Sequence, residues 1–555
     1  MSNIREVREQ WSSRPAFLLA AIGSAVGFGN IWRFPALAYK YGGGAFFIPY
    51  LLALFFVGIP LLLLEIAMGQ HLSTGDVGVF GSINHRLRGV GLISVLCGFI
   101  VTGYYVPLLA WIIREFFESF GHVDWENVAG ADASDYFFND IVGMGTLGDT
   151  LRPTRIVWEN LFCLLFAWIC IGSCVAFGIK WTGRIAYFTM GLPIVLLFVF
   201  FGRAVVLEGA QEGIYAYIGQ WDMLVLTDKP EVWSTAVSQI FFSLGTTFGI
   251  MTAFGSHCPL NAPATENSII IAFSNTFFSF IAGFAVFGSL GYLKNYEGAD
   301  DLEDVVASGP ALMFGAYPAV LSTLPGGSHW VRLLFFNLFL LGIDSAFALT
   351  EAVLTVLKDS VAGTRVREKV IVGATISAGF VMGIMYTTDA GLIFLDVVDF
   401  YVNFIMILIG FCKSFSAGWL YNLQGQLAHF GEKIVYAHMV TTFGAVFISS
   451  IFWFGLGGDT MLLGVISFLI FYGGGMYFIV KSIDELLSKI PENEWTRQSA
   501  LQELFMGNIN NLTVELESTV GKIPWMWPFL IKHFIPPVLL TLFVNLAWYD
   551  SIIED

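Results

Sequence analysis

The stretch Gly-Ser-Ala-Val-Gly-Phe-Gly-Asn-Ile-Trp-Arg-Phe-Pro at residues 23–35 decides how the rest of this chain is interpreted. It lies in the first long apolar segment, yet it holds three glycines and a bunched Asn, Arg and Pro. In hydrocarbon every backbone N–H and C=O needs an internal partner, so a broken helix is tolerated only against protein or a water-filled cavity. The stretch predicts a discontinuous helix that coordinates something. The alternative is plain helix packing, because Gly23 and Gly27 have small-xxx-small spacing.

The composition is that of a membrane protein. Of the 555 residues, 56% are hydrophobic and only 13% are charged, and the mean hydropathy is +0.72. Soluble domains carry about 25% charged residues, so the formal net charge of -16 belongs to the loops of a polytopic protein. The six cysteines lie in or beside apolar segments and form no CxxC pair, which argues against a disulfide framework or a cysteine metal site. The N-terminal residues show no secretory cleavage site, so we expect the first apolar segment to be retained.

Apolar segments long enough to cross a bilayer recur along the chain. Because a span needs about 20 apolar residues, we expect about 13 helices. They are expected near residues 14–39, 43–70, 88–120, 157–179, 184–208, 232–256, 266–294, 331–358, 367–386, 390–421, 433–456, 461–482 and 525–549. Lys and Arg gather in alternate loops and Asp and Glu in the others, so the positive-inside rule places the N-terminus in the cytoplasm. An odd number of spans puts the acidic end at 550–555 outside, and the amphipathic segment 483–520 is expected on the cytoplasmic surface.

The sixth apolar segment repeats the interruption of the first, at Gly245 and Gly249. Five spans separate the starts of these two segments, an odd number, so the second five are inverted relative to the first. Paired broken helices in inverted repeats indicate a secondary-transporter site near the bilayer midplane. We therefore expect an N-terminal segment, a first five-helix repeat, an inverted second repeat and further C-terminal helices, at residues 1–13, 14–208, 232–421 and 433–555.

The run from Trp11 to Gly69 closely resembles the neurotransmitter:sodium symporter family, whose members have the LeuT fold. Besides the opening stretch, the resemblance rests on Gly-Gly-Gly-Ala-Phe-Phe-Ile-Pro-Tyr at 42–50, Pro-Leu-Leu-Leu-Leu-Glu-Ile-Ala-Met-Gly-Gln at 60–70, Tyr104-Tyr105, residues 239–249, Asn275, Leu-Gly-Ile-Asp-Ser at 341–345 and Asp399-Phe-Tyr. It implies an all-α polytopic membrane protein with a 5+5 inverted repeat, broken helices 1 and 6, and extra C-terminal helices, about 12 to 13 spans in all.

The resemblance implies two sodium sites. The first comprises the carbonyl of Ala25 with Asn30, Ser243 and Asn275, completed by the substrate carboxylate. The second comprises the carbonyls of Gly23, Val26 and Leu341 with the side chains of Asp344 and Ser345. Unwound backbone supplies such carbonyls without charge. Asp344 is a lone carboxylate in an apolar helix, which by default indicates function; a protonated Asp bonded to a carbonyl is the alternative.

The resemblance also implies a substrate pocket. The substrate carboxylate would meet the N–H groups of Phe28 and Gly29, at a helix start suited to anions, and the hydroxyl of Tyr105. The remaining pocket residues would be Ser24, Ala25, Val101, Phe242, Ser243, Gly245, Phe248, Ser345 and Leu349. Monoamine carriers are expected to place an acidic residue at position 24, where this chain has serine. The sequence therefore favours a substrate with its own carboxylate, most simply a zwitterionic amino acid.

Ser279 predicts chloride dependence. Chloride-independent bacterial relatives carry a carboxylate at this position, and a neutral serine leaves the sodium charges under-compensated. The resemblance implies a chloride site formed by Tyr50, Gln239, Ser243, Asn275 and Ser279. Proton-linked compensation elsewhere, or a site that needs no anion, is the alternative.

Separated charged pairs predict two gates. The outer gate would be Arg33 with Asp399, with Asp396 as a competing partner. The inner gate would be formed by Arg8, Asp359, Trp11 and His257. His257 replaces the usual tyrosine of the family; it permits mild pH sensitivity, although a structural hydrogen bond is favoured. Glu65 is expected to be a buried structural carboxylate beside the broken helix.

These features together predict a multi-pass symporter of the plasma membrane. It would import an amino acid or a related small carboxylate-bearing amine by alternating access, coupled to about two Na+ and to Cl−. A ligand-gated channel or a non-transporting sensor on the same fold is the alternative. No HExxH motif, nucleophile elbow or Cys/His cluster indicates an enzyme, and no nucleic-acid partner is expected.

Overall fold

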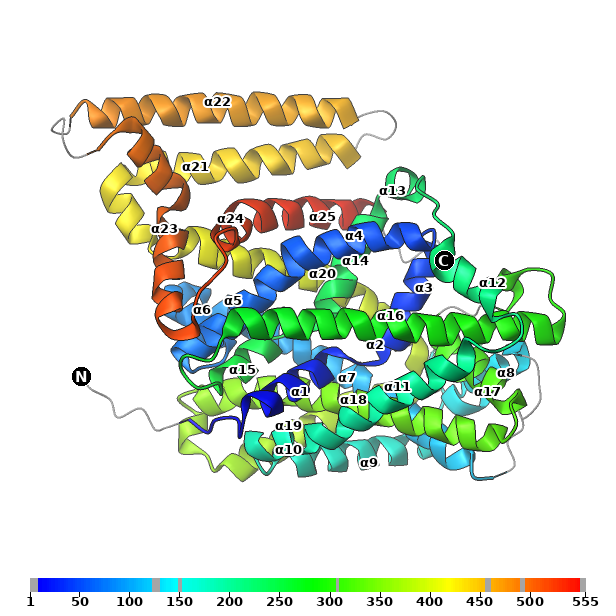
Figure 1. Ribbon diagram of the computed structural model, residues 1–555. Helices are drawn as coiled ribbons and strands as arrows, with labels where there is room; N and C mark the ends of the chain where they lie inside the picture. The colour runs from blue at the N-terminus through cyan, green and yellow to red at the C-terminus, as the bar shows by residue number, and fades with distance from the viewer. Residues whose placement is uncertain are drawn as a thin grey trace.

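The computed structural model describes residues 8–121, 130–147, 152–305, 309–454, 461–489 and 495–549. Within them the regular secondary structure is helical, and β-pairing is confined to two isolated bridges, Gly43 with Trp221 and Ile156 with Thr388. Most of the long helices run roughly along one direction (Figure 1). Eleven helices are long and apolar enough to cross a membrane, twelve with the bent pair at the start of the chain. The predicted all-α polytopic architecture is confirmed.

The main helices follow the expected segments closely. In chain order they are α1 (Arg14–Ala25), α2 (Phe28–Ile31), α3 (Arg33–Lys40), α4 (Phe47–Ala53), α5 (Ile59–Leu72), α6 (Asp76–Ile83), α7 (Arg88–Glu118), α9 (Trp158–Val175), α10 (Ile179–Thr189), α11 (Gly191–Ala204), α14 (Glu231–Leu244), α15 (Ile250–Ser256), α16 (Ala264–Glu297), α18 (Gly327–Asp359), α19 (Glu368–Gly383), α20 (Gly391–Phe415), α21 (Leu423–Phe454), α22 (Met461–Leu487), α23 (Arg497–Val520) and α25 (Ile535–Tyr549). Shorter helices α8 (Gly130–Tyr136), α12 (Ala210–Ile214), α13 (Val225–Asp228), α17 (Tyr317–Thr323) and α24 (Trp527–Phe529) lie in the connections.

The first apolar segment is broken where its glycines predict. α1 starts from a Ser13 N-cap, whose hydroxyl accepts from the backbone N–H of Ala16, and it ends at Ala25. Val26 and Gly27 are extended, and the helix resumes at Phe28 with a bend of 64° between the two halves. The break therefore interrupts the backbone hydrogen-bond ladder inside the bundle.

The sixth segment is broken as well. α14 ends at Leu244, and Gly245, Thr247 and Gly249 all have left-handed backbone with φ of 64°, 72° and 78°. Threonine in this region is strained by roughly 1–3 kcal/mol, so its surroundings must hold it there. The two halves have 14 and 7 residues, and each is too short to be counted as a span by itself. Together they form a further broken crossing besides the twelve counted above.

Close backbone packing joins the second half of this broken segment to α5. A Cβ atom added at Gly69 would lie 2.2 Å from the Thr252 carbonyl oxygen, and one added at Gly255 would lie 2.6 Å from that of Ile66. Any side chain at either glycine would push the helices apart. α5 and α15 therefore pack as a tight pair.

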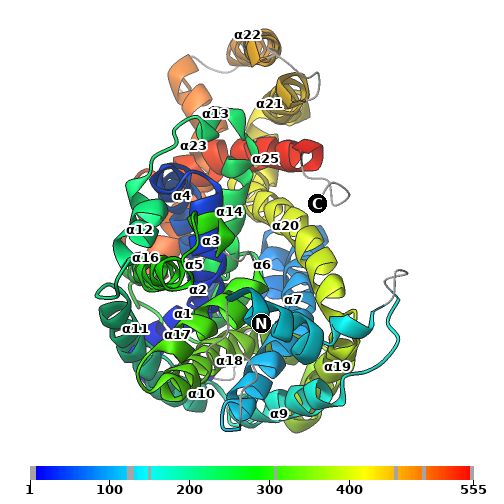
Figure 2. The ribbon, with the colours of Figure 1, turned by 90° about the vertical axis from the view of Figure 1, so that its right-hand side faces the viewer.

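The C-terminal helices extend the bundle at one edge. α21 and α22 form a hairpin there, with α22 outermost and α21 packed against α25, where Ser450 Oγ lies 3.2 Å from Thr541 Oγ1 (Figures 1 and 2). α23, within the predicted surface segment 483–520, crosses the ends of the spans at the face where α1 begins (Figure 1). We call this the proximal face and the opposite one the distal face. α25 runs from the proximal to the distal side, while the acidic end at 550–555 lies outside the described residues.

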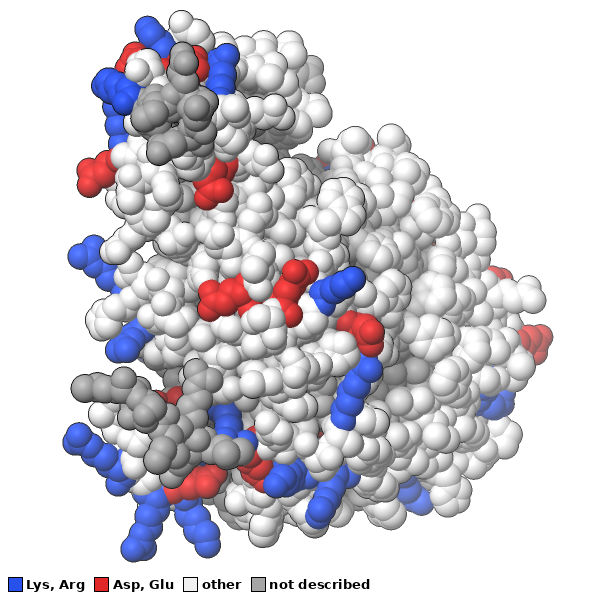
Figure 3. Space-filling view, turned by 60° about the vertical axis from the view of Figure 1, so that its left-hand side comes forward, with Lys and Arg blue, Asp and Glu red and all other residues white. Residues whose placement is uncertain are grey.

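Charged side chains are unevenly spread over this surface. Figure 3 shows Lys and Arg projecting from the side of the molecule that carries the proximal face. The exposed basic residues of the α6–α7, α9–α10 and α18–α19 connections are Arg86, Arg88, Lys180, Arg184, Arg365, Arg367 and Lys369. Of the acidic residues expected on the other side, 124, 126 and 149 lie outside the described residues. The assignment of 14–208 and 232–421 as inverted repeats stays a prediction.

Candidate functional site

The two helix breaks meet around one pocket in the centre of the bundle. Its lining comprises Ser24, Ala25, Gly27, Phe28, Gly29, Asn30, Val101, Tyr105, Phe242, Ser243, Gly245, Phe248, Ile250, Ser345 and Leu349. The structure thus brings together every residue expected at the substrate pocket, from four separate segments. The pocket has only about 30 Å³ of open volume, about enough for one water. A larger ligand would therefore have to displace side chains such as Phe242, whose ring lies 6.0 Å from that of Phe248.

A buried carboxylate faces the first break. Asp344 lies on α18, and its Oδ2 has no hydrogen-bond partner among the described residues. A Cβ atom at Gly23 would lie 2.7 Å from this oxygen, so the glycine lets the backbone approach the carboxylate. The Ser345 hydroxyl donates to the Ser24 carbonyl at 3.2 Å, and Thr189 of α10, which sequence reasoning missed, hydrogen-bonds Asp344. An uncompensated buried carboxylate is costly, and with the unwound backbone of the first break beside it this arrangement suits a monovalent cation.

A second group of polar side chains lies on the other side of the same break. Asn30 Nδ2 donates to Asn275 Oδ1 at 2.7 Å and to Ser279 Oγ at 2.7 Å, and Asn275 Nδ2 donates to Ser243 Oγ at 2.8 Å. Asn30 Oδ1 accepts from the Gly27 N–H at 2.9 Å, which caps the restarted helix. All the side chains expected at the first sodium site are therefore brought together, from α2, α14 and α16.

The expected chloride residues extend this group. Tyr50 is fully buried and its hydroxyl lies 3.3 Å from Thr276 Oγ1. Gln239 is also fully buried, and neither atom of its amide has a hydrogen-bond partner among the described residues. Leaving such a group unpaired costs about 1–3 kcal/mol. Buried donors of this kind, without a carboxylate in the set, suit a small anion.

Arg33 links the pocket to the distal side. Its Nη2 donates to Asn403 Oδ1 at 2.9 Å, its Nη1 lies 3.8 Å from Asp399 Oδ2, and its guanidinium lies 5.1 Å from the centre of the Phe242 ring. Asp399 also accepts from the Tyr104 hydroxyl at 2.7 Å. Asn403 was missed by sequence reasoning, although it follows Asp399 by one helical turn.

A large cavity lies directly beyond Arg33. It has a volume of about 480 Å³, and its lining runs from Phe28 and Phe242 to Lys40, Pro310 and Asp396. Asp396, expected as a competing partner of Arg33, lines this cavity, but the guanidinium is bound by Asn403 and paired with Asp399. The pocket is therefore approached from the distal side.

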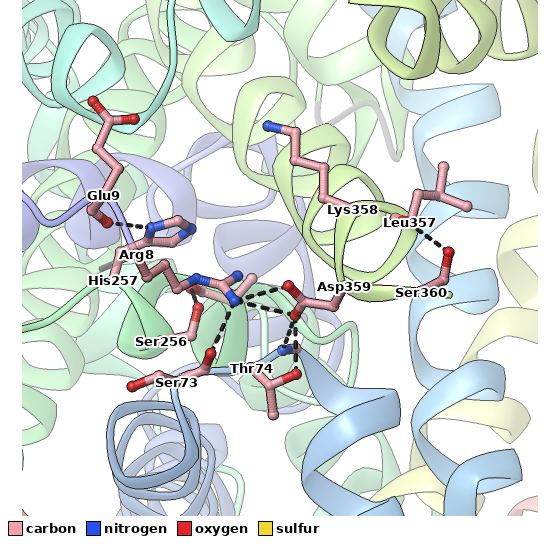
Figure 4. A network of polar contacts seen from close by, with 12 residues as sticks. Arg8, Glu9, Ser73, Thr74, Ser256, His257, Leu357, Lys358, Asp359 and Ser360 are labelled. Carbon is pink, nitrogen blue, oxygen red and sulfur yellow. Dashed lines mark hydrogen bonds and ion pairs between the residues drawn. The ribbon is translucent and has the colours of Figure 1, made fainter. Parts of the chain in front are cut away.

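The proximal side is closed by a bonded lock (Figure 4). Arg8 Nη1 donates to both oxygens of Asp359 at 2.9 and 3.1 Å and to the Ser73 carbonyl at 2.9 Å. Asp359 Oδ2 also accepts from the Thr74 hydroxyl at 2.9 Å and the Gly75 N–H at 2.8 Å. The expected inner-gate pair is thus brought together and tied to the end of α5.

Trp11 and His257 support this lock. Trp11 Nε1 donates to the Phe254 carbonyl at 3.0 Å, and the Trp11 N–H donates to the His257 carbonyl at 3.1 Å. His257 Nδ1 lies 2.7 Å from the Glu9 carbonyl (Figure 4). Burial, helped by the Arg8 guanidinium, lowers the pKa of His257 from its usual 6.5 to about 4. The imidazole is therefore neutral in the closed lock, in keeping with the favoured structural hydrogen bond.

Ser24 lies in the lining of the pocket, where it is expected. Its hydroxyl donates back to the Ala21 carbonyl at 2.8 Å, within its own helix. Gly27 also lines the pocket, and a Cβ atom added there would be 2.8 Å from Tyr105 Oη and 3.0 Å from Ser345 Oγ. A side chain at 27 would enter the pocket directly. Neither residue brings an acidic group to this break, and the inference from Ser24 to a carboxylate-bearing substrate stays a prediction.

Comparison with known proteins bears on this site. The family model described as the sodium:neurotransmitter symporter family matches residues 8–131 and 126–470. A sodium- and chloride-dependent GABA transporter 2 from Bos taurus is 35% identical over 448 residues, 75% of this chain and 73% of that protein. A sodium- and chloride-dependent taurine transporter from Rattus norvegicus is 31% identical over 75% of this chain and 71% of that protein. A sodium- and chloride-dependent creatine transporter 1 from Mus musculus is 34% identical over 71% of this chain and 67% of that protein.

Gly23→Ala tests the cation site at Asp344. The added methyl group meets Asp344 Oδ2 at 2.7 Å. We therefore expect the Na+ concentration for half-maximal thermal stabilisation to rise at least tenfold, which corresponds to a loss of about 1.4 kcal/mol in Na+ binding free energy. The matched control is Gly373→Ala in α19, where an added Cβ meets nothing within 4 Å. Equal Na+ midpoints for the two variants would rule out the site.

Acidification tests the state of His257. Its pKa is about 4 in the closed lock and about 6.5 once exposed, so the lock keeps full stability above pH 6.5 and loses it as pH falls towards 4. Between pH 7.5 and 5.5 the open fraction should rise about tenfold. This is measured as thiol labelling of Cys258 in a variant without other cysteines, normalised to the denatured protein at each pH. A similar rise in His257→Asn would assign the effect to another group.

Proposed function

This chain belongs to the sodium:neurotransmitter symporter family, and from that premise we propose that it is a sodium-coupled, chloride-dependent symporter of a small amino-acid-like zwitterion. The observation that carries the proposal is the buried, unpartnered Oδ2 of Asp344 beside the break at Gly23. A carboxylate without a counter-charge in an apolar bundle calls for a cation. The family and the named relatives are transporters, which supports transport over catalysis.

Two sodium sites are supported by the arrangement of oxygens. The second would be formed by Asp344, Ser345 and the carbonyls of Gly23, Val26 and Leu341. The first would be formed by Asn30, Ser243, Asn275 and the Ala25 carbonyl. Asn30 now turns its amide nitrogen towards Asn275. A rotation of this amide would place its oxygen there, where it could act as a sodium ligand. Both sites share the first break, so filling one would favour the geometry of the other.

The substrate proposed is a small molecule with an acidic and a basic group. GABA, taurine and creatine, which name the relatives' substrates, are all of this kind. In this chain the acidic group would meet the N–H groups of Phe28 and Gly29 and the hydroxyl of Tyr105, close to the first sodium. Phe28 stacks on Tyr105 with ring centres 4.8 Å apart, which would hold that hydroxyl at the pocket. The basic group would then point towards Phe242 and Phe248.

Chloride would balance the sodium charges. Tyr50, Gln239, Ser243, Asn275 and Ser279 would form its site, and the unpaired buried amide of Gln239 supports an anion there. With a neutral serine at 279, none of the side chains proposed for the first sodium site and the chloride site carries a negative charge. The ion would therefore be needed when both sodium ions bind.

Alternating access explains the two ends of the molecule. The lock at Arg8 and Asp359 is closed while the 480 Å³ cavity lies on the distal side of the pocket, so the structure corresponds to a state open distally. With basic residues on the proximal side, we infer that this side faces the cytoplasm and that α25 ends outside. An open channel is disfavoured because the lock and the 30 Å³ pocket obstruct a continuous pore.

The proposed coupling has ample driving force. One Na+ moving inward through about 100 mV gains about 2.3 kcal/mol, and a tenfold gradient adds about 1.4 kcal/mol. Two ions could therefore sustain a neutral-solute gradient of roughly 10⁵, less the work of moving chloride.

Uptake into proteoliposomes tests the proposal. An inward NaCl gradient should drive saturable accumulation of at least one compound from a panel of GABA, taurine, creatine and zwitterionic amino acids, first ranked by thermal shift with and without Na+. Potassium in place of sodium is the control. Ligand-evoked currents far above carrier turnover would instead favour a channel.

Ser279→Asp tests the chloride role. A fixed carboxylate would replace the anion, so uptake by this variant should be at least fivefold less sensitive than that of the wild type to replacing chloride with gluconate. Ser279→Ala, which adds no charge, should remain sensitive. Wild-type uptake that is equal in chloride and gluconate would refute chloride dependence.

A further inference from the structure

Three charged side chains meet in the core beside the second helix break. Lys413 of α20 lies 2.7 Å from Glu65 Oε1 and 2.6 Å from Asp76 Oδ2, measured from its Nζ. The exposed fractions of the three side chains are 0%, 1% and 0%. Sequence reasoning expected Glu65 to be buried but gave it no cation. The cluster therefore brings together three helices, α5, α6 and α20.

The carboxylates of this cluster hold the break itself. The N–H of Thr247 donates to Glu65 Oε1 at 2.8 Å, and the Ser94 hydroxyl lies within 2.6 Å of the Thr247 carbonyl and 2.7 Å of Asp76 Oδ2. Thr247 is the non-glycine residue with left-handed backbone in this break. The N–H of Thr247 is thus tied directly to a carboxylate bound by Lys413. Its carbonyl lies beside the Ser94 hydroxyl, whose single proton is shared between that carbonyl and Asp76 Oδ2.

Charge balance makes Lys413 the centre of the arrangement. Its ammonium group is within hydrogen-bond distance of both carboxylates, whereas Glu65 Oε2 and Asp76 Oδ1 have no hydrogen-bond partner among the described residues. Removing one partner of a buried ion pair leaves an uncompensated charge, which is strongly destabilising. Without Lys413, two carboxylates that share one ammonium would face each other in a site that excludes water.

We propose that Lys413 is a positioning residue that fixes the second helix break through Glu65 and Asp76. By holding Thr247, it sets the ends of α14 and α15 and with them the positions of Ser243 and Phe248 at the pocket. Lys413 touches neither ion nor substrate. Its expected effect on sodium binding rests on the function proposed above, whereas its effect on the backbone of the break does not.

Lys413→Met tests the proposal by hydrogen–deuterium exchange without Na+. We expect exchange in residues 245–250 to accelerate at least tenfold at pH 7.5. The Na+ concentration that gives half-maximal thermal stabilisation should also rise at least tenfold. It is measured by titrating NaCl against choline chloride, so that chloride stays constant. Lys532→Met is the matched control, because Lys532 is equally buried but is held by Asn508 and the Leu504 carbonyl. It should change neither measurement more than twofold.

Relief of charge repulsion separates positioning from loss of packing. The titratable groups that face Lys413 are Glu65, Asp76 and the Cys97 thiol. Adding Asp76→Asn to Lys413→Met, or lowering the pH to 5.5, should restore at least a third of the protection at 245–250. A packing defect would respond to neither change.

Each result decides one of the two proposals. Unchanged exchange in Lys413→Met, or faster exchange that neither Asp76→Asn nor acid relieves, overturns the role of Lys413. If Lys413→Met does not fold, Ser94→Ala keeps all three charges and should still accelerate exchange at 245–250 about threefold; no change would also overturn the role. A wild-type protein that does not respond to Na+ would count against the proposed function, while the exchange data still decide the role of Lys413.

Discussion

Two helices stop and restart inside an apolar bundle, and the backbone groups that they leave open determine much of what surrounds them. Lipid cannot satisfy these groups, so the chain must. At the first break, Asn30 accepts from the Gly27 N–H. At the second, Glu65 and Ser94 bind the N–H and carbonyl of Thr247. The polar core therefore follows from the breaks, and oxygens without a protein partner become available as ligands.

Buried carboxylates beside the two breaks differ in their compensation. Glu65 and Asp76 share the ammonium of Lys413 and are joined to the backbone of the second break. Among the described residues Asp344 forms no salt bridge, and its Oδ2 lacks a hydrogen-bond partner. A carboxylate already bound to an ammonium has less to gain from a mobile ion than one without a counter-charge. The same residue type thus ties the backbone at one break and, in the function proposed above, binds an exchangeable cation at the other.

The sequence predicted those parts that depend on local pattern. Glycine clusters located both breaks, apolar length located the spans, and the family resemblance located the pocket residues. It missed Lys413, Asn403 and Thr189, because a single polar residue in an apolar helix does not reveal which partner it will meet. Lys413 lies 348 positions from Glu65, and only the fold joins them.

The two ends of the transport path differ in how firmly they are held. On the proximal side, Arg8 binds both oxygens of Asp359, and hydrogen bonds from Thr74 and Gly75 fix that carboxylate to the end of α5. On the distal side, Arg33 and Asp399 are 3.8 Å apart, and a wide cavity lies beside them. Opening proximally must therefore break several bonds at once. Because α5 also packs against α15 backbone to backbone, a movement that releases Asp359 can be passed to the second break. The lock and the central pocket are therefore mechanically joined through one helix.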